Sequence, residues 1–253
     1  MKLKFIKILA IFLAIFTVLS TPSAAIEMQL AKATTDALTI KSQSVSVENE
    51  EKDTDTDFSE PESPIINFSE VSDDTIVAKM YICTQQVGLG HAWIYIESNF
   101  NGDMPVGCYT LKPYQGVSIG TFFISRSDGP GLYYNVEAYC ANKYGLKNES
   151  SLEMDITKEQ LLKVSKRIKQ WNYWDLYFNC TFFAAEIWNC VAKKKIVPIL
   201  FPFFVKWQIL AHGGKREIVM KNVESTDCYK QRGVGANAKI YQVKDGTLDS
   251  KLL

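Results

Sequence analysis

The chain has 253 residues, with 28 Lys and Arg balancing 28 Asp and Glu. The charges are unevenly placed, because residues 44–74 hold eleven acids and one base whereas residues 75–253 hold 22 bases and 15 acids. A basic domain is attracted to anionic surfaces such as cell-wall polymers or acidic lipid headgroups, although ordinary solubility charge explains it equally well. The sequence has no recognisable nucleic-acid-binding module and no CxxC spacing, so it argues against a nucleic acid partner and against a zinc site. No cofactor is predicted.

The first 25 residues have the pattern of a secretory signal peptide. Three lysines precede an apolar run over residues 8–19, and the small residues Ser23 and Ala25 stand at positions −3 and −1 of a cleavage site. The run is shorter than the ~20 residues of a membrane-spanning helix, and no other apolar run is long enough. We therefore expect a secreted or cell-envelope protein with no stable membrane span after signal cleavage. An uncleaved anchor is the alternative.

Residues 26–75 are rich in Ser, Thr, Asp and Glu and poor in aromatic residues, which predicts a disordered acidic tether. Residues 76–253 have the length of one domain that can bury a core without disulfide staples. We expect an α+β domain, an antiparallel sheet with packed helices. The stretches expected to form strands are 74–85, 90–98, 105–112, 116–125, 131–140, 151–156, 216–222 and 238–243. Thr157, with Gln160 three residues later, predicts a capping box and a helix.

Cys180 stands at the expected start of a second helix. Asn179 is a favoured N-cap type, which places Cys180 at the first helical position. A thiol at a helix N-terminus loses its proton more easily, and the free N–H groups there can hold an oxyanion. The apolar face of this helix is formed by Phe183, Ala184, Ile187, Val191 and Ala192. A plain buried cysteine is the alternative interpretation.

His91 is one of two histidines and opens an alternating stretch in which it shares a strand face with Trp93 and Tyr95. A Cys at a helix start and a His on a strand, distant in sequence, are typical of a Cys–His nucleophile pair. The other histidine, His212, is expected beside Gly213 at a helix C-terminus, where it complements the dipole and has no catalytic part.

The sequence GHAWIYIE, followed far downstream by YFNCTFF, resembles the circularly permuted branch of the papain-like fold. Its members include the NlpC-type peptidases and the lecithin retinol acyltransferase family. In permuted members the His strand precedes the Cys helix, and an Asn commonly precedes the Cys, which matches His91, Asn179 and Cys180. The resemblance covers residues 76–192 and implies a third polar residue that orients the imidazole.

Our first choice for this third residue is Glu137, expected on a strand face with Asn135 and Tyr139. An acid within an aromatic strand is costly unless it has a partner. A solvent-facing position at a sheet edge is the alternative for Glu137, and Tyr109 and Asn135 are the alternative third residues. Asn179 can assist the oxyanion, although capping is its simpler role.

These observations predict a secreted cysteine hydrolase, a peptidase or amidase that uses Cys180 and His91 through an acyl-enzyme. The resemblance and the positive charge suggest peptide or amide substrates, such as cell-wall peptides. An acyltransferase or lipid thiol hydrolase of the same fold is the second hypothesis, and a non-catalytic secreted binding domain is the third. Reserving Cys180 leaves five cysteines, so at least one more is expected to be free of disulfides. The apolar stretch 196–207 is expected to form a packed loop and helix rather than to touch a membrane.

Overall fold

The computed structural model describes residues 65–86, 90–123, 129–145, 149–175, 178–215 and 217–244. They belong to one compact unit, residues 61–253. The predicted signal peptide and most of the predicted tether lie outside the described residues. Described strands are β1 Ile76–Gln85, β2 His91–Ser98, β3 Met104–Val106, β4 Tyr109–Leu111, β5 Gly116–Phe122, β6 Gly131–Tyr134, β7 Ser150–Thr157, β8 Tyr229–Arg232 and β9 Lys239–Gln242. Described helices are α3 Val136–Tyr144, α4 Lys158–Lys169, α5 Cys180–Asn189 and α6 Pro202–Ala211, with 3-10 turns at Phe68–Glu70, Ser225–Asp227 and Gly235–Asn237.

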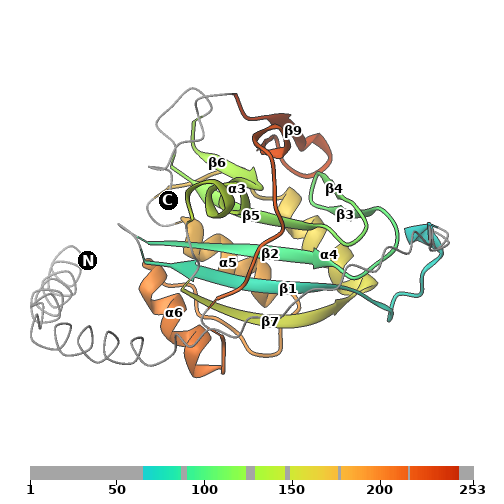
Figure 1. Cartoon of the computed structure of the whole chain (residues 1–253). Helices are drawn as coiled ribbons and strands as arrows, with labels where there is room; N and C mark the ends of the chain where they lie inside the picture. The colour runs from blue at the N-terminus through green and yellow to red at the C-terminus, as the bar shows by residue number, and fades with distance from the viewer. Residues whose placement is uncertain are drawn as a thin grey trace, which may run out of the picture. The chain divides into compact units, whose positions relative to one another are not determined.

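The fold is mixed α+β, as predicted, and is organised on an antiparallel sheet of strand order β7-β1-β2-β5-β6-β8-β9 (Figure 1). In the part of the chain described here, every strand pairing is antiparallel. Strand β2 pairs β1 with Gln85 opposite His91, and it pairs β5 with Ile94 opposite Ile119. His91 therefore lies at the end of the sheet where β1 ends and β2 begins.

The two faces of the sheet are covered by different parts of the chain. Helices α4, α5 and α6 cover one face, where Ile94 and Ile96 of β2 enter the main core (Figure 1). On the other face, Trp93 and Tyr95 pack against Ala138 of α3 and Met220 of an extended segment. Because strand side chains alternate, burial of both faces explains why residues 92–96 of β2 are apolar on both sides.

Helix starts were predicted correctly where a capping side chain marks them. Thr157 accepts from the backbone of Gln160, whose side chain accepts from Thr157, so the capping box of α4 is complete. Asn179 caps α5 as predicted. Helix α6 confirms a helix in the stretch 196–207, with Val205 and Ile209 buried but Phe203 and Trp207 exposed. No helix among the described residues is long and apolar enough to cross a membrane.

Three strand predictions were wrong. Residues 105–112 form the β3–β4 hairpin, because Gly107 takes φ 61 at the turn. The strand expected over 131–140 stops at Tyr134, and α3 begins at Val136. The described residues of 216–222 form no strand, because the segment crosses the sheet instead of running beside an edge, and its Lys221 amide donates to the Tyr95 hydroxyl. Strand β8 was not predicted.

The last residues of the predicted tether, 65–75, pack on the domain. The Phe68 ring meets Phe100 edge-on with centroids 5.8 Å apart, and Val71 packs against the main core. The Lys158 ammonium of α4 donates hydrogen bonds to the carbonyl oxygens of Ser69 and Val71. The domain therefore begins before the predicted boundary at Ile76.

Limited proteolysis of the mature chain is expected to leave a stable core whose first residue lies before Phe68. The acidic composition of the preceding segment predicts cleavage there, whereas Phe68 and Val71 are held by packing. Mass spectrometry of the resistant fragment measures its start. A fragment that begins at Ile76 and melts at the temperature of the longer one would contradict this placement.

Candidate active site

Cys180 is the first residue of α5, and the local sequence explains this position. The Asn179 side-chain oxygen accepts from the backbone N–H groups of Thr181 at 3.0 Å and Phe182 at 3.5 Å. The Asn179 amide nitrogen donates to the Leu200 carbonyl at 2.8 Å. Asn179 therefore serves as the predicted cap, and its amide also ties the helix start to the loop before α6. Cys180 is 8 % exposed at the positive end of the helix.

His91 is the first residue of β2 and is buried between aromatic rings. The Phe122 ring is stacked on the imidazole with centroids 4.5 Å apart, and the Trp93 ring lies at 5.7 Å on a nearly parallel plane. His91 Nε2 lies 3.0 Å from Glu137 Oε1. This contact leaves the other ring nitrogen, Nδ1, available to Cys180, whose sulfur raises the pKa of the ring. The imidazole thus interacts with a thiol and with a carboxylate.

Glu137 lies in the first turn of α3, not on a strand as predicted. Strand β6 ends at Tyr134 because Asn135 adopts φ 67, and the chain turns into the helix. Asn and Gly tolerate this left-handed conformation better than other residues. Glu137 is 1 % exposed, so the sheet-edge alternative is also wrong. A helix N-terminus favours an acidic side chain in its first turn, which stabilises the buried carboxylate.

Strand β5 supports Glu137 through two small residues that the sequence did not single out. The Ser118 hydroxyl donates to Glu137 Oε2 at 2.9 Å and accepts from the Ala138 amide at 3.1 Å. A Cβ atom on Gly120 would lie 1.8 Å from Glu137 Oε1 and 3.0 Å from His91 Nε2. The alternation of Ser118, Gly120 and Phe122 on one strand face was the available signal, since small residues leave room where the imidazole and the carboxylate meet.

The electrostatics of His91 follow from this geometry. Burial lowers the pKa of His91, but the charge of Cys180 and its hydrogen bond, followed by those of Glu137, outweigh burial and raise the pKa to about 9. At neutral pH the His91 ring is therefore protonated beside the Cys180 sulfur. Burial raises the pKa of the other thiols for which a shift is resolved, those of Cys83, Cys108, Cys190 and Cys228.

We expect the His91 ring to titrate near pH 9 and to titrate at lower pH in Cys180→Ala, because the sulfur that raises the pKa is removed while burial persists. NMR of ring-labelled histidine measures both midpoints, with His212 as internal reference. Since the folded-state pKa lies above the unfolded ~6.5, protonation of His91 contributes stability that is complete below that pH and is lost as pH rises through about 9. Equal midpoints in the two proteins would contradict the Cys180–His91 interaction.

The other predicted residues lie away from the imidazole. Tyr109 and Asn135, the alternative third residues, both line a groove at the opposite end of β2. His212 is the C-cap of α6, as predicted, with Nε2 3.1 Å from the Lys195 carbonyl oxygen. All six cysteines are free, and the described residues contain no cluster of His, Cys, Asp or Glu that could hold a metal ion.

Comparison of the chain with protein-family models, with curated proteins and with solved structures finds no match. The site therefore has to be interpreted from its own geometry. That geometry joins Cys180, His91 and Glu137 from α5, β2 and α3, three elements distant in sequence.

Proposed function

We propose that this protein is a cysteine hydrolase of the permuted papain-like type, a peptidase or amidase that works through an acyl-enzyme. The observation that carries the proposal is the unbroken series of contacts from Cys180 to His91 to Glu137. The order of a His strand before a Cys helix, with Asn at the cap, supports the resemblance to that fold. The position of Glu137 on a helix differs from the strand position that the sequence predicted.

In the proposed reaction the Cys180 thiolate attacks the amide carbonyl carbon and forms a tetrahedral intermediate. The backbone N–H of Cys180, at the first position of α5, is suited to hold the oxyanion because N–H groups there have no partner within the helix. The His91 imidazolium gives its proton to the leaving amine. The neutral ring then takes a proton from water, which attacks the acyl-enzyme and releases the carboxylic acid and the thiolate. Glu137 holds the ring orientation and stabilises its charged form.

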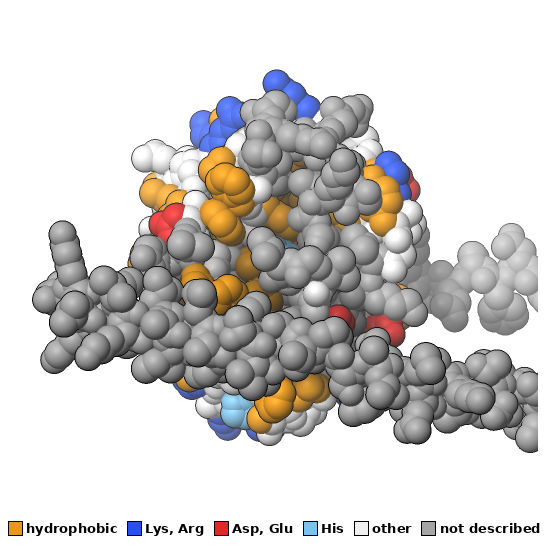
Figure 2. Space-filling model, turned by 90° about the vertical axis from the view of Figure 1, so that its left-hand side faces the viewer, with side chains coloured by type: hydrophobic (Ala, Val, Ile, Leu, Met, Phe, Trp, Pro, Cys, Tyr) orange, Lys and Arg blue, Asp and Glu red, His pale blue; other side chains and the backbone are white. Residues whose placement is uncertain are grey.

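Lipid or acyl substrates form a second candidate function, favoured by the aromatic surroundings of the site. Phe123 follows the ring stacked on His91 and is 65 % exposed, and Phe178, two residues before Cys180, is 45 % exposed. Phe201 follows the loop bonded to Asn179 and is 41 % exposed. Figure 2 views the end of the sheet where β1 ends and β2 begins, and hydrophobic side chains gather there. Exposed apolar clusters at a site indicate an apolar partner.

The test compares substrates on the purified mature chain and its Cys180→Ser variant. Peptide amides, peptidoglycan fragments, and phospholipid vesicles with thioester or ester reporters are offered in parallel. Release of an amine with a trapped acyl group mapped to Cys180 would support the amidase. Turnover of the lipid reporters alone would favour the second candidate. If neither reaction occurs and Cys180→Ser binds the offered compounds as tightly as the wild type, the non-catalytic binding domain is favoured.

A further inference from the structure

A cavity lies at the end of the sheet opposite the Cys–His pair and has no part in the proposed reaction. Its volume is about 610 Å³, within the range of ligand sites. One wall is Gly116, the first residue of β5, which pairs with Glu97 near the end of β2, whereas His91 begins β2. The two positions are six residue steps apart along the strand, a distance of about 20 Å. A ligand in this groove would not reach Cys180.

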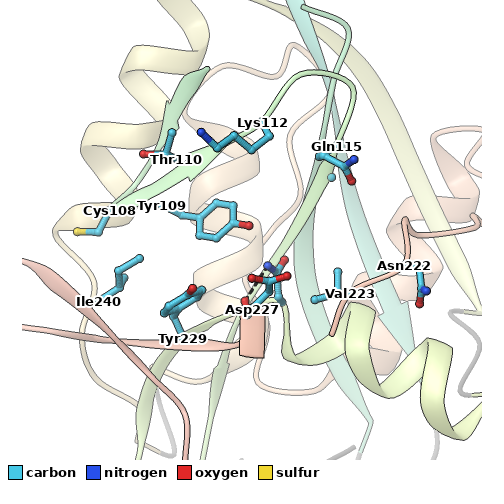
Figure 3. A pocket seen from close by; sticks show the side chains of 12 residues that line it. Cys108, Tyr109, Thr110, Lys112, Gln115, Asn222, Val223, Asp227, Tyr229 and Ile240 are labelled. Atoms are coloured by element: carbon cyan, nitrogen blue, oxygen red, sulfur yellow. Dashed lines mark hydrogen bonds between the residues drawn. The ribbon is translucent and has the colours of Figure 1, made fainter. Parts of the chain in front are cut away.

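Two tyrosines form an aromatic wall of the groove. Tyr109 of β4 and Tyr229 of β8 have ring centroids 5.9 Å apart, and both line the cavity (Figure 3). Tyr109 is itself stacked on the buried ring of Tyr134, with centroids 6.1 Å apart. Rings held in this way offer a rigid apolar face together with a hydroxyl group. Such a surface suits a flat ring that carries C–H groups on its face and polar groups at its rim.

Polar groups converge below this wall. Asn135 lines the groove, where its side-chain nitrogen donates to the Asp227 backbone carbonyl at 3.0 Å and its side-chain oxygen accepts from the Ser118 backbone N–H at 3.3 Å. Asn135 does not cap α3 with its side chain, although it occupies the N-cap position. Burial raises the pKa of Tyr109, so its hydroxyl stays protonated at neutral pH. The Gln115 amide and the Asp227 carboxylate complete the set.

The charges in the groove argue for a neutral ligand. Lys112 lines the cavity, but its ammonium lies 2.6 Å from the Asp103 carboxylate, which offsets the positive charge. The Asp227 side chain brings a negative charge to the same groove. An anion would meet this carboxylate, and a purely apolar ligand would take the exposed Gln115 amide and Asp227 carboxylate out of water without replacing their hydrogen bonds. Vicinal hydroxyl groups satisfy both kinds of group, because a hydroxyl accepts from an amide N–H and donates to an amide or carboxylate oxygen.

We propose that this groove is a binding site for a neutral, polyhydroxylated ring compound, an oligosaccharide in chemical class. One sugar ring lies against Tyr109 and Tyr229, and its hydroxyl groups bond to Gln115 and Asp227. This site is independent of the catalytic proposal, because it needs neither the thiol nor the imidazole. It would hold the domain on a glycan while the other end of the sheet carries out its chemistry.

The test titrates chitotriose, cellotriose and maltotriose into the full mature chain, followed by heteronuclear NMR and calorimetry. We expect saturable binding of at least one trisaccharide, with shifted resonances at Tyr109 and Gln115 and none at His91. Tyr109→Ala is expected to weaken binding at least tenfold, and Cys180→Ser is expected to leave it unchanged. Tyr241→Ala is the matched control, because Tyr241 is an exposed tyrosine of β9 outside the lining of the groove.

Gln115→Ala provides a second measurement, since Gln115 is exposed and its truncation leaves the core intact. We expect it to weaken binding severalfold with an unchanged melting temperature, so that it reports on the groove even if Tyr109→Ala unfolds. The proposal is overturned if none of the three sugars binds saturably. It is also overturned if Gln115→Ala and Tyr241→Ala bind the sugar alike, or if inorganic phosphate competes for the site.

Discussion

Replacing Cys180 with Ser is expected to lower hydrolysis by at least ~10³-fold while changing the melting temperature little. The sulfur is the nucleophile of the proposed reaction, and a hydroxyl in its place is far less reactive at neutral pH. Steady-state turnover of the wild type and the variant, with thermal melts of both, measures the effect. The same experiment on Cys190→Ser, a half-buried thiol at the other end of α5, is the matched control and should leave turnover unchanged.

Alkylation identifies the reactive thiol without a known substrate. Iodoacetamide at neutral pH is expected to label Cys180 first, because it alone faces an imidazolium at a helix N-terminus while burial raises the pKa of Cys83, Cys108, Cys190 and Cys228. His91→Ala removes the positive charge and should slow this labelling and shift its pH profile upward. Peptide mapping against pH measures both. An inert Cys180, or an identical profile without His91, would sink the catalytic proposal in favour of a binding domain.

Glu137→Gln is expected to lower turnover by about tenfold to a hundredfold and to leave the domain folded. The amide has the volume of the carboxylate but not its charge, so it stabilises the imidazolium less, and general acid–base catalysis contributes about 10²–10⁴-fold in all. Glu137 raises the pKa of His91, so the His91 titration should move to lower pH in this variant. A merely structural role would not move that midpoint. Unchanged turnover together with an unchanged midpoint would remove Glu137 from the site.

Gly120→Ala tests the contact between Glu137 and His91 from strand β5. Its Cβ would overlap Glu137 Oε1, so the carboxylate must move away from His91, and turnover is expected to fall as it does in Glu137→Gln. Gly116→Ala is the matched control on β5, because its Cβ would meet the Tyr95 hydroxyl at 2.0 Å, away from the imidazole. It should lower stability while the labelling rate of Cys180 is kept. Similar loss of labelling in both variants would indicate general unfolding.

Local sequence signals determined the parts of the site that depend on neighbouring residues. Asn179 before Cys180 predicts the cap and hence the place of the thiol, because an N-cap bonds to amides only two or three residues away. The alternation after His91 predicts strand β2. The apolar side chains on both faces of this strand predict in turn that both faces are buried. The capping box at Thr157 is local in the same sense. The residue types also predicted that Cys180 and His91 form a pair, but no local signal fixes how close the two side chains lie.

Only the tertiary structure decided how the third residue reaches the imidazole. The aromatic stretch around Glu137 favours a strand, yet Asn135 takes a left-handed conformation and the carboxylate enters from a helix. That turn depends on β5, since the backbone N–H of Asn135 donates to the Ser118 carbonyl oxygen, and β5 is held in place by β2. The space for the carboxylate comes from Gly120, seventeen positions earlier. Secondary-structure propensity depends on neighbours along the chain. The contact between Glu137 and His91 arises instead where separate strands and a helix meet, so packing overrides the strand propensity of this stretch.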